Sequence, residues 1–155
     1  MKKKAVAESA IDAHIYKVFP NDLNAHYTMF GGRVMAISDR LALVVAERHS
    51  GNMCVTVSID DVHFLGPAKD GETLVFSAAM NRAWTSSMEI GVRVVTENSY
   101  TGERRHIVSA YFTFVALDEN GNTCGVPKLV PESKAEKRRY RQAGVRRQSR
   151  VKQSK

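Results

Sequence analysis

Asp39 is the residue of this sequence best suited to chemistry, because it is a carboxylate in a segment with little other polarity. The stretch from Gly31 to Ser50, GGRVMAISDRLALVVAERHS, is apolar at most positions. A helix that is hydrophobic on nearly all sides is usually wrapped by the rest of its domain, and an aspartate is almost never fully buried without a partner. Asp39 is therefore a candidate general base or nucleophile, and the alternative is a structural ion pair with Arg40 or a more distant basic residue.

Two further candidates precede Asp39 in the chain. Gly31-Gly32 stands where a polar loop meets the predicted helix, and Asn24 lies in that loop. Free N–H groups at a helix N-terminus bind anions or a developing oxyanion, although a glycine pair also allows close packing of a helix start. The Asn24 amide can orient water or polarise a carbonyl, or it is only a turn residue. Asp39 follows Gly31 by about 12 Å along a helix axis, at roughly 1.5 Å per residue.

The histidines and cysteines carry no catalytic or metal signature. His26, His49 and His63 do not stand beside a serine or cysteine in any local nucleophile motif, and no pair of them has metal-ligand spacing. Cys54 and Cys124 form neither a metal motif nor a disulfide framework. We therefore expect structural histidines and no metal site.

Length and composition indicate one soluble domain. A chain of 155 residues with 43% hydrophobic and 25% charged residues is ordinary for a globular domain. No apolar stretch approaches the length of a bilayer span, and the N-terminus has no continuous apolar region of the secretory type. We expect a cytoplasmic protein.

The positive charge of the chain is concentrated at its end. The formal net charge is +7, and residues 131–155 hold ten Lys/Arg against two Glu, so residues 1–130 carry about −1. This basic tail has too few large apolar residues to fold alone. Ser133, with Glu136 three residues later, predicts a capped helix over residues 133–142.

The elements that must position Asp39 are one long helix and a set of strands. The helix is predicted from about Gly31 to His49, ended by Ser50-Gly51. The strand-like stretches, with turn signals such as Asp70-Gly71 and Thr101-Gly102 between them, are Asp12–Phe19, Cys54–Phe64, Glu72–Ala83, Ser87–Glu97 and Arg105–Leu117. This order predicts an α+β fold in which an antiparallel sheet curls around one helix.

Taken together, the sequence resembles the single-domain hot-dog acyl-CoA thioesterases over about residues 10–145. The segments that carry the resemblance are Pro20-Asn21-Asp22-Leu23-Asn24, Thr28-Met29-Phe30-Gly31-Gly32, Asp39, Val57-Ser58-Ile59-Asp60, Gly66-Pro67, Asp70-Gly71, Ser86-Ser87-Met88-Glu89, Thr101-Gly102-Glu103 and Phe112-Thr113-Phe114-Val115-Ala116. The resemblance implies the hot-dog fold, a curved antiparallel sheet wrapped around a long central helix. The implied division is a flexible segment over residues 1–9, a hot-dog domain over 10–131 and a basic helix and tail over 132–155.

The resemblance also implies the assembly and the site. Members are dimers whose sheets join edge to edge, commonly assembled into hexamers as trimers of dimers, with active sites at the dimer interface. Asn24 and Asp39 match the catalytic pair, contributed by different subunits, and the Gly32 N–H would receive the oxyanion. The residues implied to contact substrate or coenzyme A are Gly31, Ser58, Ser86, Ser87, Met88, Arg93, Thr101, Gly102 and Arg104.

This site predicts hydrolysis of a fatty acyl-CoA to a fatty acid and coenzyme A. A thioester is already activated, so the reaction needs a placed water, a base and oxyanion stabilisation, and no metal or organic cofactor. Asp39 would activate the water or attack directly through an anhydride. Two departures from the family pattern, Tyr27 and Trp84 at positions that are usually glycine, place aromatic bulk near the expected groove and leave the preferred acyl length open.

Three other functions stay possible from the sequence. A hot-dog hydratase or dehydratase would need an active-site histidine near the helix start, where Phe30 precedes the glycines. A regulatory acyl-CoA-binding hot dog would lack an acid such as Asp39. The basic tail could bind nucleic acid or an anionic membrane, but Tyr140 is its only aromatic residue and it has no base-reading motif. We expect neither nucleic acid nor membrane as a partner.

Overall fold

The computed structural model describes residues 2–153, which form a main sheet with a helix on each face and a separate two-stranded sheet. The elements, in chain order, are β1 Lys3–Ala5, the 3-10 helix η1 Val6–Glu8, β2 Ile11–Lys17, the 3-10 helix η2 Pro20–Asp22, α1 Gly31–Ser50, β3 Met53–Phe64, β4 Thr73–Ala83, β5 Ser87–Glu97, β6 Arg104–Leu117, β7 Lys128–Val130 and α2 Lys134–Gln153.

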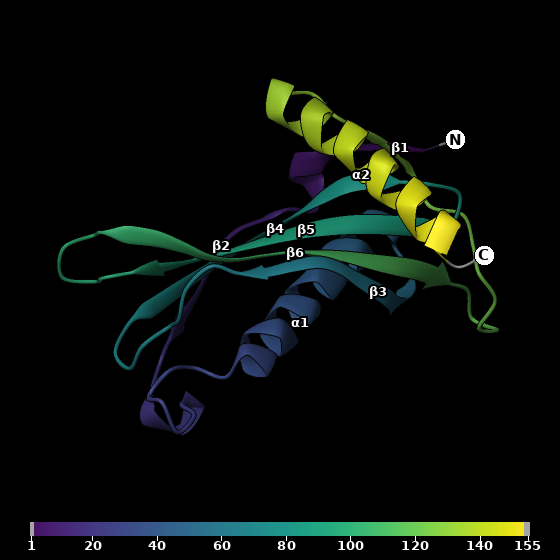
Figure 1. Cartoon of the computed structure of the whole chain (residues 1–155). Helices are drawn as coiled ribbons and strands as arrows, with labels where there is room; N and C mark the ends of the chain where they lie inside the picture. The colour runs from purple at the N-terminus through teal and green to yellow at the C-terminus, as the bar shows by residue number, and fades with distance from the viewer. Residues whose placement is uncertain (1, 154–155) are drawn as a thin grey trace.

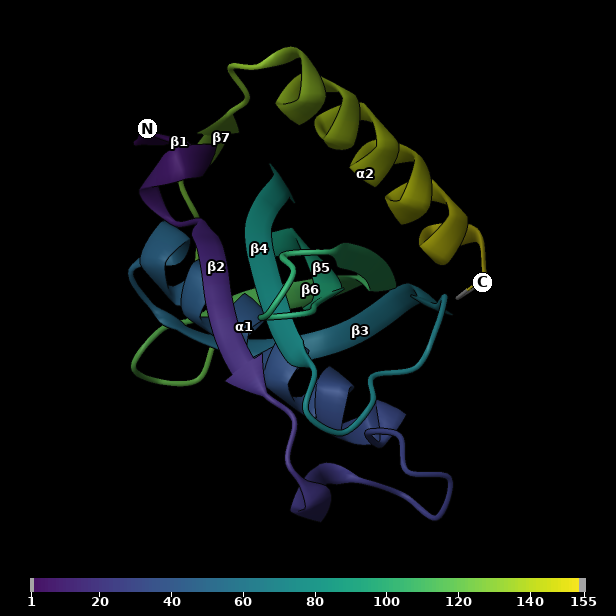
Figure 2. The ribbon, with the colours of Figure 1, turned by 90° about the vertical axis from the view of Figure 1, so that its left-hand side faces the viewer.

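The main sheet has five antiparallel strands in the order β2-β4-β5-β6-β3. It curves around α1, while α2 crosses its other face (Figures 1 and 2). We call these the α1 face and the α2 face. Irregularities in the ladders, such as the register shift between Thr56 and Ser58 of β3, bend strands and increase their twist. The predicted α+β class is confirmed, with the main strands within one or two residues of their expected bounds.

The core lies between α1 and the sheet. Strands contribute large side chains such as Phe76, Phe112 and Phe114, each fully buried, and α1 opposes them with the small Ala42 and Ala46. Small helix residues let the helix approach the sheet closely, so the large strand side chains fill the space at high density.

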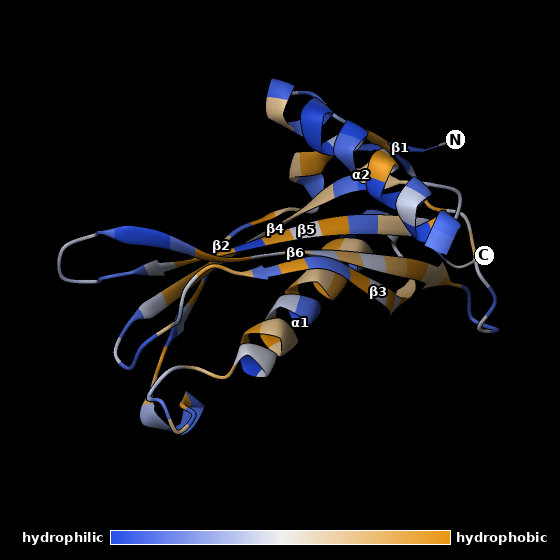
Figure 3. Cartoon of the chain, viewed as in Figure 1, coloured by the Kyte–Doolittle hydropathy of each residue, from blue (hydrophilic) through white to orange (hydrophobic). Residues whose placement is uncertain are grey.

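The expectation that α1 is wrapped on all sides is wrong for this single chain. Its buried residues form one stripe, while Ala36, Arg40 and Val44 are exposed. The helix therefore shows both orange and blue positions, whereas α2 is mostly blue, with an orange turn in its second half (Figure 3). Asp39 lies at the edge of the buried stripe and is half-buried.

The N-terminal segment, expected to be flexible over residues 1–9, contains the short elements β1 and η1. Strand β1 pairs in parallel with β7, and the Lys4 ammonium donates to the Arg48 carbonyl at the end of α1, 2.8 Å away. Strands of three residues are too short to show an alternating pattern, so neither was predicted.

Helix α2 begins as predicted and continues further. The Glu136 N–H donates to Ser133 Oγ (3.1 Å) and the Ser133 N–H donates to the Glu136 carboxylate (2.6 Å), which is the expected capping box. Those backbone hydrogen bonds, first that of Ser133, hold the pKa of Glu136 below its usual value. The helix extends to Gln153 rather than Gln142.

Two arginines of the basic tail pack against the sheet. Arg146 forms an ion pair with the fully buried Glu89 of β5 (2.7 Å) and stacks on the ring of Tyr111, 3.7 Å from its centroid. Arg147 lies over Trp84 of the β4–β5 turn, 4.5 Å from its ring centroid. These contacts attach α2 to the α2 face, so the expected boundary after residue 131 does not separate it from the domain.

Candidate active site

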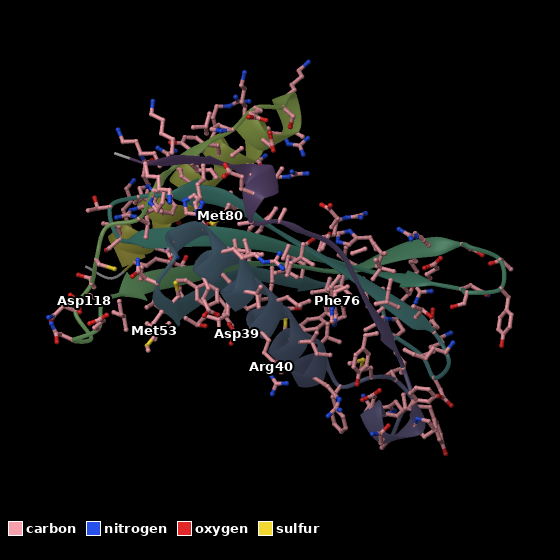
Figure 4. The ribbon with its side chains drawn as sticks, turned by 180° about the vertical axis from the view of Figure 1, so that it is seen from behind. Asp39, Arg40, Met53, Phe76, Met80 and Asp118 are labelled. Atoms are coloured by element: carbon pink, nitrogen blue, oxygen red, sulfur yellow. The ribbon has the colours of Figure 1, made fainter. Side chains whose placement is uncertain are left out.

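Asp39 lies in the middle of α1 and faces strand β3 (Figure 4). Thr56 Oγ1 donates a hydrogen bond to Asp39 Oδ1 over 2.8 Å. Within residues 2–153 Asp39 has no ion pair, so the structural pairing with Arg40 is not formed. A half-buried carboxylate held by one hydroxyl keeps acceptor sites free for a water or a substrate.

Thr56 was not anticipated from the sequence. It lies in a predicted strand, where a threonine is an ordinary β-forming residue. In the structure the β3–β6 register shifts between Thr56 and Ser58. Such a bulge cannot be recognised from the alternation of residues in the sequence. Bulges are common beside active sites, where they re-aim a side chain.

Asn24 is held in a tight loop before α1. Its Oδ1 accepts from the His26 N–H (2.8 Å) and from both the N–H and the hydroxyl of Thr28 (3.3 Å each). The Asn24 Nδ2 group donates to none of the described residues, so its two N–H bonds are free to meet a ligand. The loop therefore fixes the orientation of the Asn24 amide through hydrogen bonds to its oxygen alone.

Asp22 anchors the same loop and was also missed as a structural residue. It is buried and accepts hydrogen bonds from the Tyr16 hydroxyl (2.7 Å) and the Phe19 N–H (3.1 Å), while Arg33 pairs with it at 2.6 Å. Burial would raise the pKa of Asp22, but these hydrogen bonds and the Arg33 charge together hold it below its usual value. The carboxylate thus ties the loop both to β2 and to the first turn of α1.

Tyr27 occupies a backbone position that favours glycine. Its φ is 61°, in the left-handed region, where a residue with a bulky side chain is strained. The side chain is 77% exposed. A glycine at this position would avoid the strain, and this chain instead holds an aromatic residue that projects outward.

The paired glycines have different surroundings. A Cβ on Gly31 would lie 3.1 Å from the Phe64 ring, so Gly31 is needed for close packing, whereas a Cβ on Gly32 would meet nothing within 4 Å. Neither glycine N–H donates to a described residue, and α1 has no side-chain cap. The N–H of Gly32 is thus an open donor at the positive end of the helix dipole.

An apolar pocket of about 330 Å³ adjoins this helix start. Its walls include Met29, Gly31, Val34, Phe64 and Ile107. A pocket with apolar walls beside free backbone donors can bind a chain that ends in a carbonyl.

The described residues contain no hydrogen bond between Asn24 and Asp39. Asn24 precedes the helix and Asp39 lies two turns along it, on the side of β3. Within one chain, therefore, the side chains of Asn24 and Asp39 do not contact each other through a hydrogen bond.

Comparison with known proteins agrees with this architecture. The sequence profile of the Thioesterase superfamily matches residues 26–103. The chain belongs to the thioesterase superfamily. It is 42% identical over 120 residues to the uncharacterized acyl-CoA thioester hydrolase YkhA of Bacillus subtilis (strain 168), a match that covers 77% of this chain and 70% of YkhA.

Solved thioesterase structures match over nearly the whole chain. An acyl-CoA hydrolase of Staphylococcus aureus, in complex with butyryl coenzyme A, coenzyme A and coenzyme A disulfide, superposes with a TM-score of 0.91 and 39% identity, covering 98% of this chain and 94% of that one. Mutant structures of that hydrolase carry alanine in place of an aspartate, an asparagine or a threonine. An apo-hexameric acyl-CoA thioesterase gives a TM-score of 0.95 at 35% identity, covering 99% of this chain and 98% of that one. The hot-dog thioesterase resemblance is confirmed.

The thioesterase fold does not bring the predicted coenzyme A contacts together in one chain. Ser86 and Ser87 lie at one end of β5, and Thr101, Gly102 and Arg104 lie at the hairpin beyond its other end, about 33 Å away at roughly 3.3 Å per strand residue. These two groups cannot hold one ligand group within the same subunit.

Several of these side chains already have partners. The Ser87 hydroxyl accepts from Arg147 (3.0 Å), the Ser58 hydroxyl donates to Asp60 (3.4 Å), and Arg104 pairs with Glu97 (3.6 Å). Met88 is fully buried in the core, so its side chain is not available to a ligand.

Arg93 lies on the α2 face, where it lines a hollow between the sheet and α2. It is thus separated from Asp39 by the sheet itself. The prediction that Arg93 acts in the same site as Asp39 does not fit the arrangement within one chain.

Two further observations bear on the thioesterase surface. No helix within residues 2–153 is long and apolar enough to cross a membrane. In the same range, no three His, Cys, Asp or Glu side chains come together in a way that could hold a metal ion.

Proposed function

We propose that this chain is an acyl-CoA thioesterase that hydrolyses a fatty acyl-CoA to a fatty acid and coenzyme A, with Asp39 as the base. The observations that carry the proposal are the Asp39–Thr56 contact between α1 and β3 and the free N–H of Gly32 at the start of α1. A carboxylate with free acceptor sites and a fixed orientation suits general-base catalysis.

In the proposed reaction Asp39 removes a proton from water while the water oxygen attacks the thioester carbonyl. The carbonyl π electrons move to oxygen, where the Gly32 N–H stabilises the negative charge, and the Asn24 amide orients the water or the carbonyl. The intermediate then collapses, the C–S bond breaks with its electron pair on sulfur, and the proton held by Asp39 passes to the thiolate. Direct attack by Asp39 through an anhydride is the alternative route to the same products.

The mutants of the Staphylococcus aureus hydrolase support this assignment. Their replaced asparagine, aspartate and threonine are separated by fifteen and then seventeen residues. The same separations hold here for Asn24, Asp39 and Thr56. An equal order, type and spacing in a relative that binds butyryl coenzyme A favours one shared site.

A second subunit completes this site in our proposal. Strand β3 is an edge of the sheet, and Met53, Val55, Val57 and Ile59 along it are all more than 40% exposed. An exposed apolar edge strand is a template for pairing with another chain. Edge-to-edge pairing would bring a neighbour's helix start toward Asp39, so that Asn24 and Asp39 act from different subunits, and the hexameric relative supports further assembly.

The proposal includes no cofactor, and the cytoplasmic location remains a prediction from the sequence. The second candidate is a regulatory protein that binds acyl-CoA without hydrolysing it. Asp39 and its Thr56 contact favour the enzyme, because binding alone does not need an oriented carboxylate.

A thiol-release assay over a series of saturated acyl-CoA chain lengths tests the proposal. We expect turnover of at least one substrate, lost in Asp39→Asn and retained in Glu47→Gln, which removes an exposed carboxylate from the same helix. Binding of acyl-CoA without turnover by the folded wild-type oligomer would favour the regulatory candidate.

A further inference from the structure

The side chains of β3 change face at the bulge between Thr56 and Ser58. Thr56 is paired with Phe114 of β6. Ser58 is paired with Thr113, the residue next to Phe114. Successive residues of a strand point to opposite faces of the sheet, and paired residues point to the same face. Thr56 and Ser58 therefore face opposite sides, whereas two residues at this spacing in a regular strand would share a face.

The hydrogen bonds on the two faces agree with this change. On the α1 face, Thr56 donates to Asp39 over 2.8 Å. On the α2 face, Nη1 of Arg150 donates to Oδ2 of Asp60 over 2.9 Å, and the Ser58 hydroxyl donates to the same oxygen over 3.4 Å. The ion pair of Arg150 and Asp60 thus connects α2 to β3 immediately beyond the bulge.

This part of β3 has little other support for its conformation. The strand is an edge of the sheet and, within residues 2–153, forms its ladder with β6 alone. The ladder is irregular on both sides of Asp60, because a second register shift lies between Asp60 and His63. Asp61, within that shift, has a φ of 47°, which is uncommon for a residue other than glycine. Such a backbone persists only where its surroundings fix it.

The position of the ion pair favours a role at β3 over a role in attaching α2. Arg146 already attaches the helix through the fully buried Glu89 of the central strand β5, 2.7 Å away. Arg150 lies 3.8 Å from the same Glu89, but its shorter contact is with Asp60 of β3. The side chains of Arg150 and Asp60 are only 21% and 24% exposed, so salt screens their attraction less than that of a surface pair.

We propose that Arg150 and Asp60 are positioning residues of the thioesterase. Their ion pair fixes the bulge of β3, and the bulge orients Thr56 toward Asp39. Neither residue contacts the reacting atoms, so α2 affects the reaction through the conformation of one strand. The inference rests on the proposed function, because it concerns the orientation of the proposed base.

Steady-state kinetics of Arg150→Gln tests the role of the pair. We expect kcat to fall by about three- to tenfold, in the range of couplings between residues of one network, with KM within about twofold because the substrate contacts remain. Asp60→Asn keeps the shape of its side chain and should show the same loss, and Arg150→Lys keeps the charge and should recover most of it. The matched control Lys152→Gln removes one charge from an exposed position of α2 and should leave kcat unchanged.

A double-mutant cycle with Thr56→Val separates positioning from general destabilisation. If the pair acts through Thr56, Arg150→Gln should change kcat by less than about twofold in the Thr56→Val background. A general effect on folding or assembly would lower kcat by the same factor in both backgrounds. That result, an unchanged kcat in Arg150→Gln, or an equal loss in Lys152→Gln would each overturn the proposal.

Amide hydrogen exchange tests the same pair without any substrate. Loss of the ion pair should speed exchange in peptides that cover residues 56–60 and leave β5 unchanged, because exchange reports local opening and β5 is paired on both sides. Unchanged exchange at residues 56–60 in Arg150→Gln would overturn the inference while an active wild type upholds the proposed function. An inactive wild type with faster exchange in Arg150→Gln would overturn the proposed function, and the catalytic role of the pair with it, but not its hold on the bulge.

Discussion

A carboxylate lies on each side of the sheet, Glu89 on the α2 face and Asp39 on the α1 face, and the two differ in burial and in hydrogen bonding. On the α2 face Glu89 is fully buried and accepts hydrogen bonds from Asn81 (3.0 Å) and twice from Arg146 (3.1 and 2.7 Å). On the α1 face Asp39 is half-buried and accepts one hydrogen bond from Thr56. The buried carboxylate has several hydrogen-bond donors around it, whereas the half-buried one keeps acceptor sites free.

The comparison extends to how the two helices are attached. Helix α1 packs through an apolar stripe, whereas α2 is held by guanidinium groups on Glu89 and on aromatic rings. Arginine suits this role because it combines a bidentate fork with a flat face that stacks on aromatic rings. A hollow remains between α2 and the sheet, while on the other side β3 is an exposed edge of the sheet.

The largest expected effect comes from breaking the ion pair of the α2 face. Glu89→Gln would leave Arg146 partly buried without a counter-charge, which should lower the free energy of unfolding by about 3–5 kcal/mol. Chemical denaturation measures it. The control on the same strand is Glu97→Gln, whose partner Arg104 lies at 3.6 Å near the surface and whose loss should cost less than about 1 kcal/mol. Equal losses in the two variants would show that the buried pair has no special role.

On the α1 face the matching test removes the single partner of Asp39. Thr56→Val keeps the shape of the side chain but deletes the donor, and should lower kcat/KM by about 10- to 100-fold, as expected for a hydrogen bond to a charged group worth roughly 1.5–3 kcal/mol. Stability should change far less than in Glu89→Gln. Steady-state kinetics beside Thr101→Val, a hairpin control, checks this, and an unchanged kcat/KM would remove Thr56 from the site.

The contrast between Asp39 and Glu89 also explains how far the sequence could lead. The helix, the main strands and the position of Asp39 followed from periodicity, turns and family resemblance. The argument from burial identified Asp39, which is only half-buried, whereas Asp22 and Glu89 are buried. Glu89 could not be recognised because a strand that is covered on both faces has no alternating pattern to reveal which residue lies under a distant helix.

The contacts of α2 could not be predicted for a related reason. Arg146, Arg147 and Arg150 look like solvent-exposed charge in the sequence, and their partners lie from 57 to 90 residues earlier. The fold alone brings them together. The Thr56–Asp39 contact could not be predicted because it depends on how α1 packs against β3. The burial of Met88 could not be predicted because a motif does not show which way a strand residue points.

A smaller effect concerns the pH dependence of stability at the far end of α1. His49 is fully buried; its Nε2 lies 2.8 Å from the Pro127 carbonyl and must donate to it, which leaves Nδ1 buried without a partner in the described chain. Burial lowers the pKa of His49 below its usual value, against the opposing effect of the Pro127 hydrogen bond, with minor contributions from Lys4 and Glu8.

Since the unfolded chain then binds more protons, stability should fall as the pH drops below about 6.5, by at most about 1.4 kcal/mol per pH unit for this one group. Denaturation midpoints from pH 7.5 to 5 measure the slope. His49→Gln keeps a donor for Pro127 but has no titration in this range, so its slope should be flatter. An identical slope would assign the acid sensitivity to other groups.

The smallest expected effect is at Gly144, a glycine in the interior of α2. Glycine costs about 1 kcal/mol relative to alanine in an exposed helix, so Gly144→Ala would stabilise α2 if helix propensity alone decided. A Cβ at this position would lie 2.5 Å from Nη1 of Arg82, whose guanidinium stacks on Tyr140 (4.2 Å to the ring centroid) and donates to its carbonyl. The arginine would have to leave this position, so we expect Gly144→Ala to lower the free energy of unfolding by about 1 kcal/mol, a cost typical of overpacking.

Denaturation of Gly144→Ala in the wild-type and Arg82→Met backgrounds separates the effect of helix propensity from that of overpacking. With the guanidinium removed, the same alanine should become neutral or stabilising. A stabilising alanine in the wild-type background would mean that the Arg82 contact contributes nothing to holding α2 on the sheet.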